Sequence, residues 1–273
     1  MSLVADLHVH STASDGELTP SSIVAKAASK GITALALTDH DTVDGLPEAH
    51  VAGSIHGVTI VPGIELSTQY KNSEVHILGY FIQPDRDEFR LTIEQLRQAR
   101  HQRAREILRQ LNRLGMHLSW DQVLNHLKGG IVGRPHIARA LVSAGYVQSV
   151  QEAFECYLEQ DRPAYVPRYR LSPQEAIQLI HDSNGAAVLA HPGILAKPSY
   201  LPELLELNWQ GIEVFHPDHT DEITNILQKI AQERNLIPTG GSDFHCDDCH
   251  CRNLGARVVN ETVVLSLKRR CRF

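Results

Sequence analysis

The chain has 273 residues, 42% of them hydrophobic, and a formal net charge of −6. This composition suits a folded domain with a substantial core, and the negative balance argues against a protein that coats duplex DNA. No apolar run approaches the ~18 residues that cross a bilayer, and no leader segment precedes the first motif. We therefore expect a cytoplasmic protein with no membrane partner.

The first third of the chain predicts short strands joined by turns and a helix. Residues 3–10 predict a strand in which His8 and His10, two residues apart, share one face. Pro20, after a threonine cap, begins a helix that ends near Gly31. Further strands are predicted at 32–37, 58–61 and 75–81.

The middle of the chain is different because no strand pattern interrupts it. Helices are predicted there at 87–114, 120–127, 136–144 and 150–158. We therefore expect an inserted helical subdomain at residues 86–165, which would form a lid or substrate pocket. Residues 1–85 and 166–273 would together form the main domain.

The last third returns to alternating strands and helices. Ser172 opens a helix with a capping box, and further elements are predicted as strands at 186–189, 211–215 and 236–239 and as a helix at 223–231. Such alternation is typical of an α/β protein with a largely parallel sheet. About seven strands can be counted, which favours a distorted barrel over an open sheet.

Histidine and carboxylate residues follow or end many of these strands. In a β/α barrel, strand ends meet at the rim where active sites form. Imidazole and carboxylate ligands together suit Zn²⁺, Mn²⁺ or Fe²⁺. The clusters predict a multinuclear metal site, and they are His8 with His10, Asp39-His40-Asp41, Glu65, Glu74 with His76, His191, and Asp243 with His245.

Several segments resemble those of the polymerase-and-histidinol-phosphatase (PHP) family of phosphoesterases. They are Asp-Leu-His8-Val-His10-Ser, Asp15-Gly, Thr-Asp-His40-Asp, Pro-Gly-Ile-Glu65, Val-His76-Ile-Leu-Gly, Ala-His191-Pro and Gly-Ser-Asp243-Phe-His245. Gly133-Arg134-Pro-His136 and Pro163-Ala-Tyr-Val-Pro resemble one subgroup. That subgroup contains nucleoside 3′,5′-bisphosphate phosphatases and 5′–3′ exoribonucleases.

The resemblance implies a distorted (β/α)7 barrel with a helical insertion and ligands for three divalent ions, Mn, Fe or Zn. His8, His10, Glu65 and Asp243 would hold one ion, and Glu65 would bridge to a second ion held by His76 and His191. A third would be held by Asp15, His40 and His245. Asp6, Asp39 and Asp41 would orient imidazoles. Metal-activated water would hydrolyse nucleotides or short 5′-phosphorylated RNA.

The expected substrate contacts centre on Arg134, because a guanidinium matches phosphate bidentately. His136, Arg162 and Arg168 are further candidates for the substrate pocket, and His216, His245 and Asp243 are candidates for catalysis. Four arginines of the first inserted helix are expected on a solvated face, namely Arg97, Arg100, Arg103 and Arg105. The protein would be a monomer or weak oligomer.

Cys246, Cys249 and Cys251 lie beside the last motif, and we expect free thiols in a surface loop there rather than a zinc site. Three other functions stay open. The first is a histidinol-phosphate-type phosphatase, and the second is an amidohydrolase deaminase, whose pattern leaves Asp15 and Glu65 without a role. The third is a metal-binding PHP module without catalysis.

Overall fold

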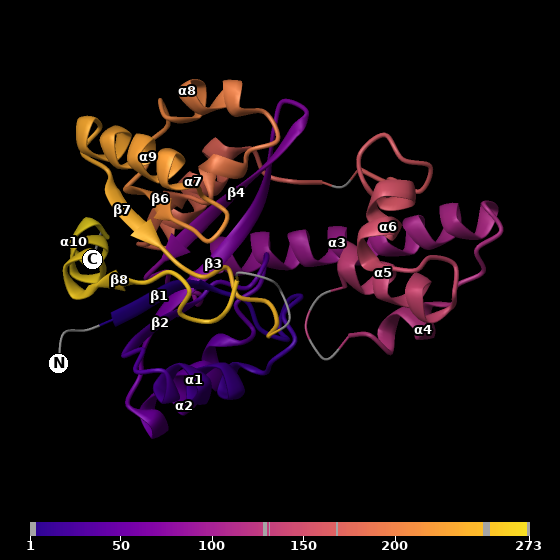
Figure 1. Ribbon diagram of the computed structural model, residues 1–273, viewed down its shortest axis with the longest axis horizontal. Helices are drawn as coiled ribbons and strands as arrows, with labels where there is room; N and C mark the ends of the chain where they lie inside the picture. The colour runs from indigo at the N-terminus through magenta and orange to yellow at the C-terminus, as the bar shows by residue number, and fades with distance from the viewer. Residues whose placement is uncertain (1–3, 128–129, 131, 168, 248–251, 272–273) are drawn as a thin grey trace.

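One curved sheet forms the centre of the computed structural model, which describes residues 4–127, 130, 132–167, 169–247 and 252–271. Within these residues the sheet has eight strands in the order β7-β6-β5-β4-β3-β2-β1-β8. The strands are β1 (Val4–Val9), β2 (Ala34–Leu37), β3 (Thr59–Tyr70), β4 (Ser73–Tyr80), β5 (Ala186–Leu189), β6 (Gly211–Phe215), β7 (Ile237–Gly240) and β8 (Val259–Asn260). The sheet curls into a nearly closed barrel (Figure 1).

Helices cover the barrel and form a separate lobe beside it (Figure 1). Those packed around the barrel are α1 (Pro20–Ser29), α2 (Leu46–His56), α7 (Pro173–Asp182), α8 (Leu201–Leu204), α9 (Asp221–Glu233) and α10 (Glu261–Arg270). The lobe contains α4 (Trp120–Leu124), α5 (Arg134–Ser143) and α6 (Val150–Ala153), followed by a π-helical turn at Phe154–Leu158. The long helix α3 (Asp87–Arg113) joins the two parts.

The barrel is distorted because its strands do not all run the same way. β1, β2 and β3 are parallel, as are β5, β6 and β7, but β4 is antiparallel to both β3 and β5. The barrel closes where Phe244, just after β7, bridges to Val9 of β1 and accepts a hydrogen bond from the N–H of His10 at 2.9 Å. The predicted fold class is confirmed, with the short β8 as an eighth strand.

Local sequence explains where the main helices begin. Thr19 caps α1 by accepting the N–H of Ser22 at 3.2 Å, and Pro20 occupies its first turn. Ser172 and Glu175 form the expected capping box at the start of α7. The elements that the sequence pattern missed are α2, α8, α10 and β8, and the strand predicted at 58–61 extends to Tyr70 in β3.

The apolar residues form separate clusters in the barrel and in the lobe. In the barrel, Leu35 and Leu37 of β2 pack among helix residues, whereas the alternate residues Ala34 and Ala36 belong to a second cluster on the opposite face. The lobe has its own cluster, which includes Leu111 and Leu141. The expected insertion at 86–165 therefore contains a hydrophobic core of its own.

One glycine lets the strands that carry the site come together. A Cβ atom on Gly241 would lie 2.3 Å from the backbone nitrogen of His8, closer than real Cβ contacts allow. Only a residue without a side chain permits the segment after β7 to pass so close to β1. This contact brings Asp243 beside His8 and His10. No helix of the described part of the chain is long and apolar enough to cross a membrane.

Candidate metal centre

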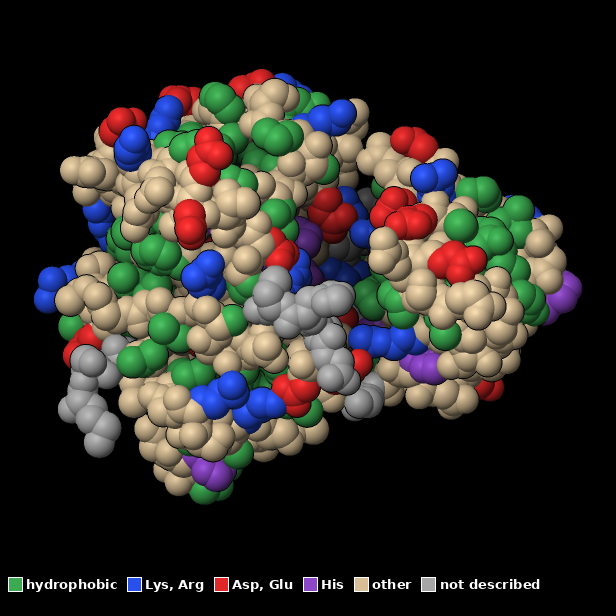
Figure 2. Space-filling model, viewed as in Figure 1, with side chains coloured by type: hydrophobic (Ala, Val, Ile, Leu, Met, Phe, Trp, Pro, Cys, Tyr) green, Lys and Arg blue, Asp and Glu red, His purple; other side chains and the backbone are tan. Residues whose placement is uncertain are grey.

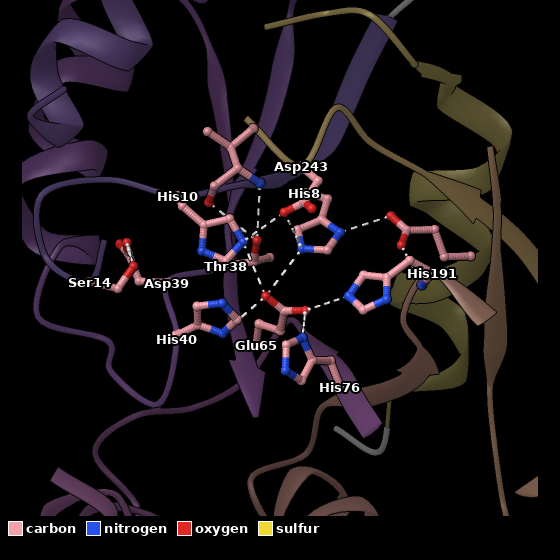
Figure 3. Close-up of polar contacts among 12 residues, drawn as sticks. His8, His10, Ser14, Thr38, Asp39, His40, Glu65, His76, His191 and Asp243 are labelled. Carbon is pink, nitrogen blue, oxygen red and sulfur yellow. Dashed lines mark hydrogen bonds and ion pairs between the residues drawn. The ribbon is translucent and has the colours of Figure 1, made fainter. Parts of the chain in front are cut away.

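The carboxylate of Glu65 lies at the centre of the site and faces five imidazoles (Figure 3). Its Oε2 lies 3.3 Å from His8 Nε2, 3.1 Å from His10 Nε2 and 3.1 Å from His40 Nδ1. Its Oε1 lies 3.0 Å from His76 Nδ1 and 3.1 Å from His191 Nε2. The two oxygens therefore face two different groups of imidazoles, as a bridging carboxylate requires.

Asp243 and Asp15 complete two further groupings of donor atoms. Asp243 Oδ1 lies 3.3 Å from His8 Nε2 and 3.2 Å from His10 Nε2. Asp15 Oδ1 lies 3.4 Å from His245 Nε2. Three sets of donors that each lie within 4.8 Å of one another are His8, His10, Glu65 and Asp243; His40, Glu65 and His76; and His10, Asp15, His40 and His245.

All nine residues expected as ligands therefore converge at one rim of the barrel. Seven come from strand ends or the turns after them. Glu65 and His76 instead lie within β3 and β4, because this antiparallel hairpin continues past the rim. The antiparallel pairing places Ser67 of β3 opposite His76 of β4. The candidate ligands Glu65 and His76 therefore lie on neighbouring strands with an offset of two residues.

The buried donor atoms fit a cation better than they fit one another. Within the described part of the chain, His8 Nε2, both ring nitrogens of His10, His40 Nδ1 and Asp15 Oδ1 are buried without a hydrogen-bond partner. They nevertheless approach carboxylate or imidazole atoms to between 3.1 and 3.9 Å. Buried polar atoms are rarely left unpaired. Lone pairs directed toward a shared point explain both facts, and a divalent cation there would satisfy them.

Charge interactions in the chain itself also favour cation binding. Burial opposes ionisation of Glu65, but His40, His8 and His76 outweigh it and hold its pKa well below its usual value. Burial likewise opposes protonation of His76, but Glu65 and Glu74 raise its pKa to about 10. The carboxylates thus attract positive charge strongly. A cation that binds here would displace protons from the imidazoles.

One residue that orients two of the candidate ligands was not predicted. Glu213, fully buried in β6, accepts a hydrogen bond from His8 Nδ1 at 3.0 Å and from the backbone N–H of His191 at 2.7 Å. The first bond puts the proton of a neutral His8 on Nδ1 and leaves Nε2 facing Glu65 and Asp243. A single glutamate in an otherwise apolar strand was the signal available in the sequence.

The three aspartates expected to orient imidazoles accept hydrogen bonds from backbone N–H groups of the rim, and two of them also bind a serine hydroxyl or an arginine. Asp6 accepts the N–H groups of Ser242 and Gly255, both at 2.9 Å. Asp39 accepts hydrogen bonds from Ser11 and Ser14 at 2.6–2.7 Å. Asp41 forms an ion pair with Arg100 at 2.6 Å and accepts the N–H of Ser67. Short loops at the rim need such acceptors for their backbone donors.

His216 lies against the candidate ligand Asp243 and is fully buried. Its Nδ1 accepts the N–H of Asp218 at 3.1 Å, so a neutral ring carries its proton on Nε2, 3.4 Å from Asp243 Oδ2. Arg252 donates to the same Oδ2 at 2.5 Å. These two donors leave Asp243 Oδ1 to face His8 and His10.

A cavity of about 320 Å³ opens beside this centre, between the barrel and the lobe (Figure 2). Asp15, His40, His76 and His191 line its barrel side. Its lobe side is lined by Arg100, Arg103 and Arg134 of α3 and α5, together with apolar residues of these helices and Phe154. Figure 2 shows basic, acidic and histidine side chains gathered in the hollow between the two parts.

Two arginines of α3 were wrongly expected on a solvated face. Arg100 is mostly buried and donates to Asp41 and to Ser67 Oγ, and Arg103 is buried and donates to the carbonyl of Val166 at 2.7 Å. They are three residues apart and share the helix face of the buried Leu96 and Ile107. That spacing was a signal in the sequence. Arg97 is only half-exposed and pairs with Asp44 at 3.1 Å, whereas Arg105 is exposed as expected.

The other substrate candidates are placed differently from Arg134. His136 is buried, accepts the N–H of Gly133 at 3.0 Å and is absent from the described residues that line the cavity. Arg162 is exposed in a surface turn and is absent from the same lining. Arg168 lies outside the described residues.

The cysteine cluster beside the last motif also departs from the expectation. Cys246 is disulfide-bonded, so the predicted free thiol is wrong for this residue. It is also buried rather than on the surface, because it directly follows the tightly packed segment that carries Asp243 and His245. Cys249 and Cys251 lie outside the described residues.

Comparison with known proteins identifies the class to which this fold and site belong. The PHP domain family model matches residues 6–234. A solved structure from Bifidobacterium adolescentis, assigned as a metal-dependent phosphoesterase, superposes with a TM-score of 0.89 at 29% identity, covering 98% of this chain and 96% of that one. The chain belongs to the PHP domain family.

Curated relatives are similar to this chain over nearly their whole length. The 5′–3′ exoribonuclease Rnm of Salmonella typhimurium is 34% identical, over 94% of this chain and 89% of its own. The 3′,5′-nucleoside bisphosphate phosphatase of Chromobacterium violaceum is 34% identical, over 92% and 90%. The phosphoribosyl 1,2-cyclic phosphate 1,2-diphosphodiesterase of Eggerthella lenta is 32% identical, over 94% and 99%. The chain is a metal-dependent hydrolase of phosphoric esters.

Proposed function

We propose that this enzyme removes a phosphate group from nucleoside 3′,5′-bisphosphates and also acts on short 5′-phosphorylated RNA. One observation carries the proposal. A cavity of about 320 Å³ has candidate metal-binding side chains on one wall and three arginines on the opposite wall. A substrate with two separated anionic groups can use both walls at once. The cavity volume lies in the range of small-molecule sites and is too small for a duplex.

The nine convergent residues would hold the metal ions, and the proposed number is three. His8, His10, Glu65 and Asp243 surround the first position; Glu65, His76 and His191 the second; and Asp15, His40 and His245 the third. Divalent ions bound there would activate water and neutralise charge on the phosphate oxygens. Mn, Fe or Zn are the ions proposed, in a cytoplasmic monomer or weak oligomer.

The chain's own residues would bind and orient the substrate around this centre. Arg134 lines the cavity, and a guanidinium can pair with two phosphate oxygens at once. His216 holds its proton on Nε2 beside Asp243, and His245 donates from Nδ1 to the carbonyl of Asp243 at 2.9 Å. These bonds keep the proposed catalytic residues Asp243, His216 and His245 in one fixed arrangement.

A substrate panel tests the proposal. The purified protein with Mn²⁺ is offered adenosine 3′,5′-bisphosphate, a short 5′-phosphorylated RNA, histidinol phosphate and a cyclic ribose phosphate, and released phosphate is measured. We expect the highest kcat/KM for the bisphosphate and no turnover in excess chelator. The cyclic ester is included because the E. lenta relative is named for that chemistry. Preference for histidinol phosphate or the cyclic ester would overturn the proposal.

An arginine variant sharpens the same test. Arg134→Ala removes a charged partner of the substrate, which costs about 2 kcal/mol, so KM for the bisphosphate should rise about 30-fold while metal content stays unchanged. Arg109→Ala is the matched control, because Arg109 is exposed on α3 and pairs with Glu106 outside the cavity. An unchanged KM in Arg134→Ala would remove this residue from substrate binding.

A further inference from the structure

Glu74 lies between the candidate metal centre and two arginines, Arg134 and Arg170. It lies on β4, two residues before His76. Its Oε1 accepts from His76 Nε2 at 3.3 Å, and its Oε2 lies 2.7 Å from Arg170 Nη2 and 3.4 Å from Arg134 Nη2. One carboxylate thus contacts a candidate metal ligand and two arginines.

The two arginines are held in different ways. Arg170 is almost fully buried, with 5% of its side chain exposed, and it donates to Gln69 at 2.9 Å as well as to Glu74. Arg134 is more open, with 22% of its side chain exposed. Among the described residues, its side chain donates to Glu74 and to the carbonyl of Leu158, and both hydrogen bonds are long at 3.4 Å. Arg170 is therefore the main counterion of Glu74.

This difference matters for ligand binding. A carboxylate near Arg134 would normally compete with a phosphate for its guanidinium. Because Arg170 already forms a short ion pair with Glu74, the positive charge of Arg134 stays available to the cavity. The close contact to Arg170 thus keeps Arg134 from being drawn into a tight ion pair of its own.

We propose that Arg170 and Glu74 are positioning residues: Arg170 neutralises Glu74, so that Glu74 can orient His76 while Arg134 remains available to a substrate phosphate. The inference rests on the proposed function, in which Arg134 anchors phosphate. In this proposal both residues act through His76 and Arg134 rather than on the substrate itself. Their roles predict opposite effects on anion binding, which a purely structural role would not produce.

A double-mutant cycle tests this inference. The variants are Arg170→Met, Glu74→Gln and the double variant, and isothermal titration calorimetry measures the Kd of the full-length, metal-free chain for adenosine 3′,5′-bisphosphate. We expect Arg170→Met to raise Kd about tenfold, because Arg134 then pairs with Glu74. The double variant should return to within about threefold of the unmutated chain, because the competing carboxylate is gone.

Glu74→Gln alone separates the second role of this residue. The Kd for the bisphosphate should stay unchanged or fall, whereas the metal content after dialysis against limiting Mn²⁺ should drop, because the neutral amide oxygen of Gln accepts from His76 more weakly than the carboxylate does. Arg170→Lys keeps the positive charge and should stay within about threefold of the unmutated chain. Arg109→Met controls for the loss of one positive charge on α3, outside the cavity.

The cycle has clear contrary outcomes. If Arg170→Met leaves Kd unchanged, or if Glu74→Gln fails to restore binding in the double variant, the coupling does not exist. A general loss of structure in Arg170→Met would appear in Arg170→Lys or in thermal unfolding as well. The cycle is repeated with inorganic pyrophosphate. Coupling with pyrophosphate, together with no turnover of nucleotides, would overturn the proposed function but keep this inference.

Discussion

The barrel and the helical lobe contribute opposite charges to the same cavity. The barrel side presents buried carboxylates and imidazoles on strand ends and on the β3–β4 hairpin. The lobe side presents arginines on α3 and α5. The barrel donors are fixed by neighbouring strands, whereas the arginines depend on how the lobe packs. The difference suggests that the reaction belongs to the barrel and the choice of substrate to the lobe.

The strongest test of this division is a change at the centre of the barrel side. Glu65→Gln replaces one oxygen that faces the imidazoles with an amide NH₂, which repels cations. We expect kcat to fall by about 10³-fold and bound metal to decrease, because both groups of donors share this carboxylate. Steady-state kinetics and elemental analysis measure the two effects.

The control for this change lies in the lobe. Glu106→Gln makes the same substitution on α3, at a residue paired with Arg109 on the surface, and should alter neither quantity. Full turnover and full metal content in Glu65→Gln would show that Glu65 does not bridge the ions, and the assignment of reaction to the barrel would fail.

The stability of the lobe provides a second, smaller test. Leu141 is fully buried in the lobe cluster, away from the metal donors. Leu141→Ala should destabilise the lobe by about 3 kcal/mol, because it leaves a cavity in a packed core. The chain has two tryptophans, Trp120 in α4 and Trp209 before β6, so fluorescence of single-tryptophan variants can follow each part during urea unfolding.

We expect Leu141→Ala to shift the Trp120 transition more than the Trp209 transition, and to leave metal content unchanged. The matched change in the barrel is Leu189→Ala in β5, which should shift the Trp209 transition. Equal shifts of both transitions in either variant would mean that the two parts unfold together, despite their separate clusters.

Much of the barrel side could be predicted from sequence because its signals are local. His8 and His10 share a face through the strand period, and the residues after β2, β5 and β7 meet at one rim. The assignment of donors to ions came from family resemblance rather than from spacing. Strand direction could not be inferred, because β4 has the same apolar pattern whether it pairs parallel or antiparallel.

The lobe side was harder to predict because its residues act through distant contacts. Arg100 and Arg103 stand in a run of charged residues, and charged runs are usually solvated. Their partners, Asp41 and the carbonyl of Val166, lie more than 50 residues away in the sequence. Arg134 was found only through its motif, and the pairing of Glu74 with Arg170 had no local signal.

The smallest expected effect concerns the lobe alone and its response to pH. Burial lowers the pKa of His136 to about 4, and the neutral ring accepts the N–H of Gly133 at the start of α5. In the unfolded chain the pKa is near 6.5. The unfolded state therefore binds the proton first as pH falls, so stability is complete above about pH 6.5 and decreases down to about pH 4.

Between pH 7 and pH 5.5 this residue should cost the folded chain about 1 kcal/mol, which urea unfolding followed at Trp120 can measure. His136→Gln keeps an acceptor for Gly133 but does not titrate, so its stability should fall by about 1 kcal/mol less over the same range. Because His136 faces the start of α5 rather than the cavity lining, KM for the bisphosphate should stay within about twofold of the unmutated chain. An equal pH response in both proteins would show that His136 is not the source of the pH dependence. A large rise in KM in His136→Gln would instead assign this histidine to substrate binding.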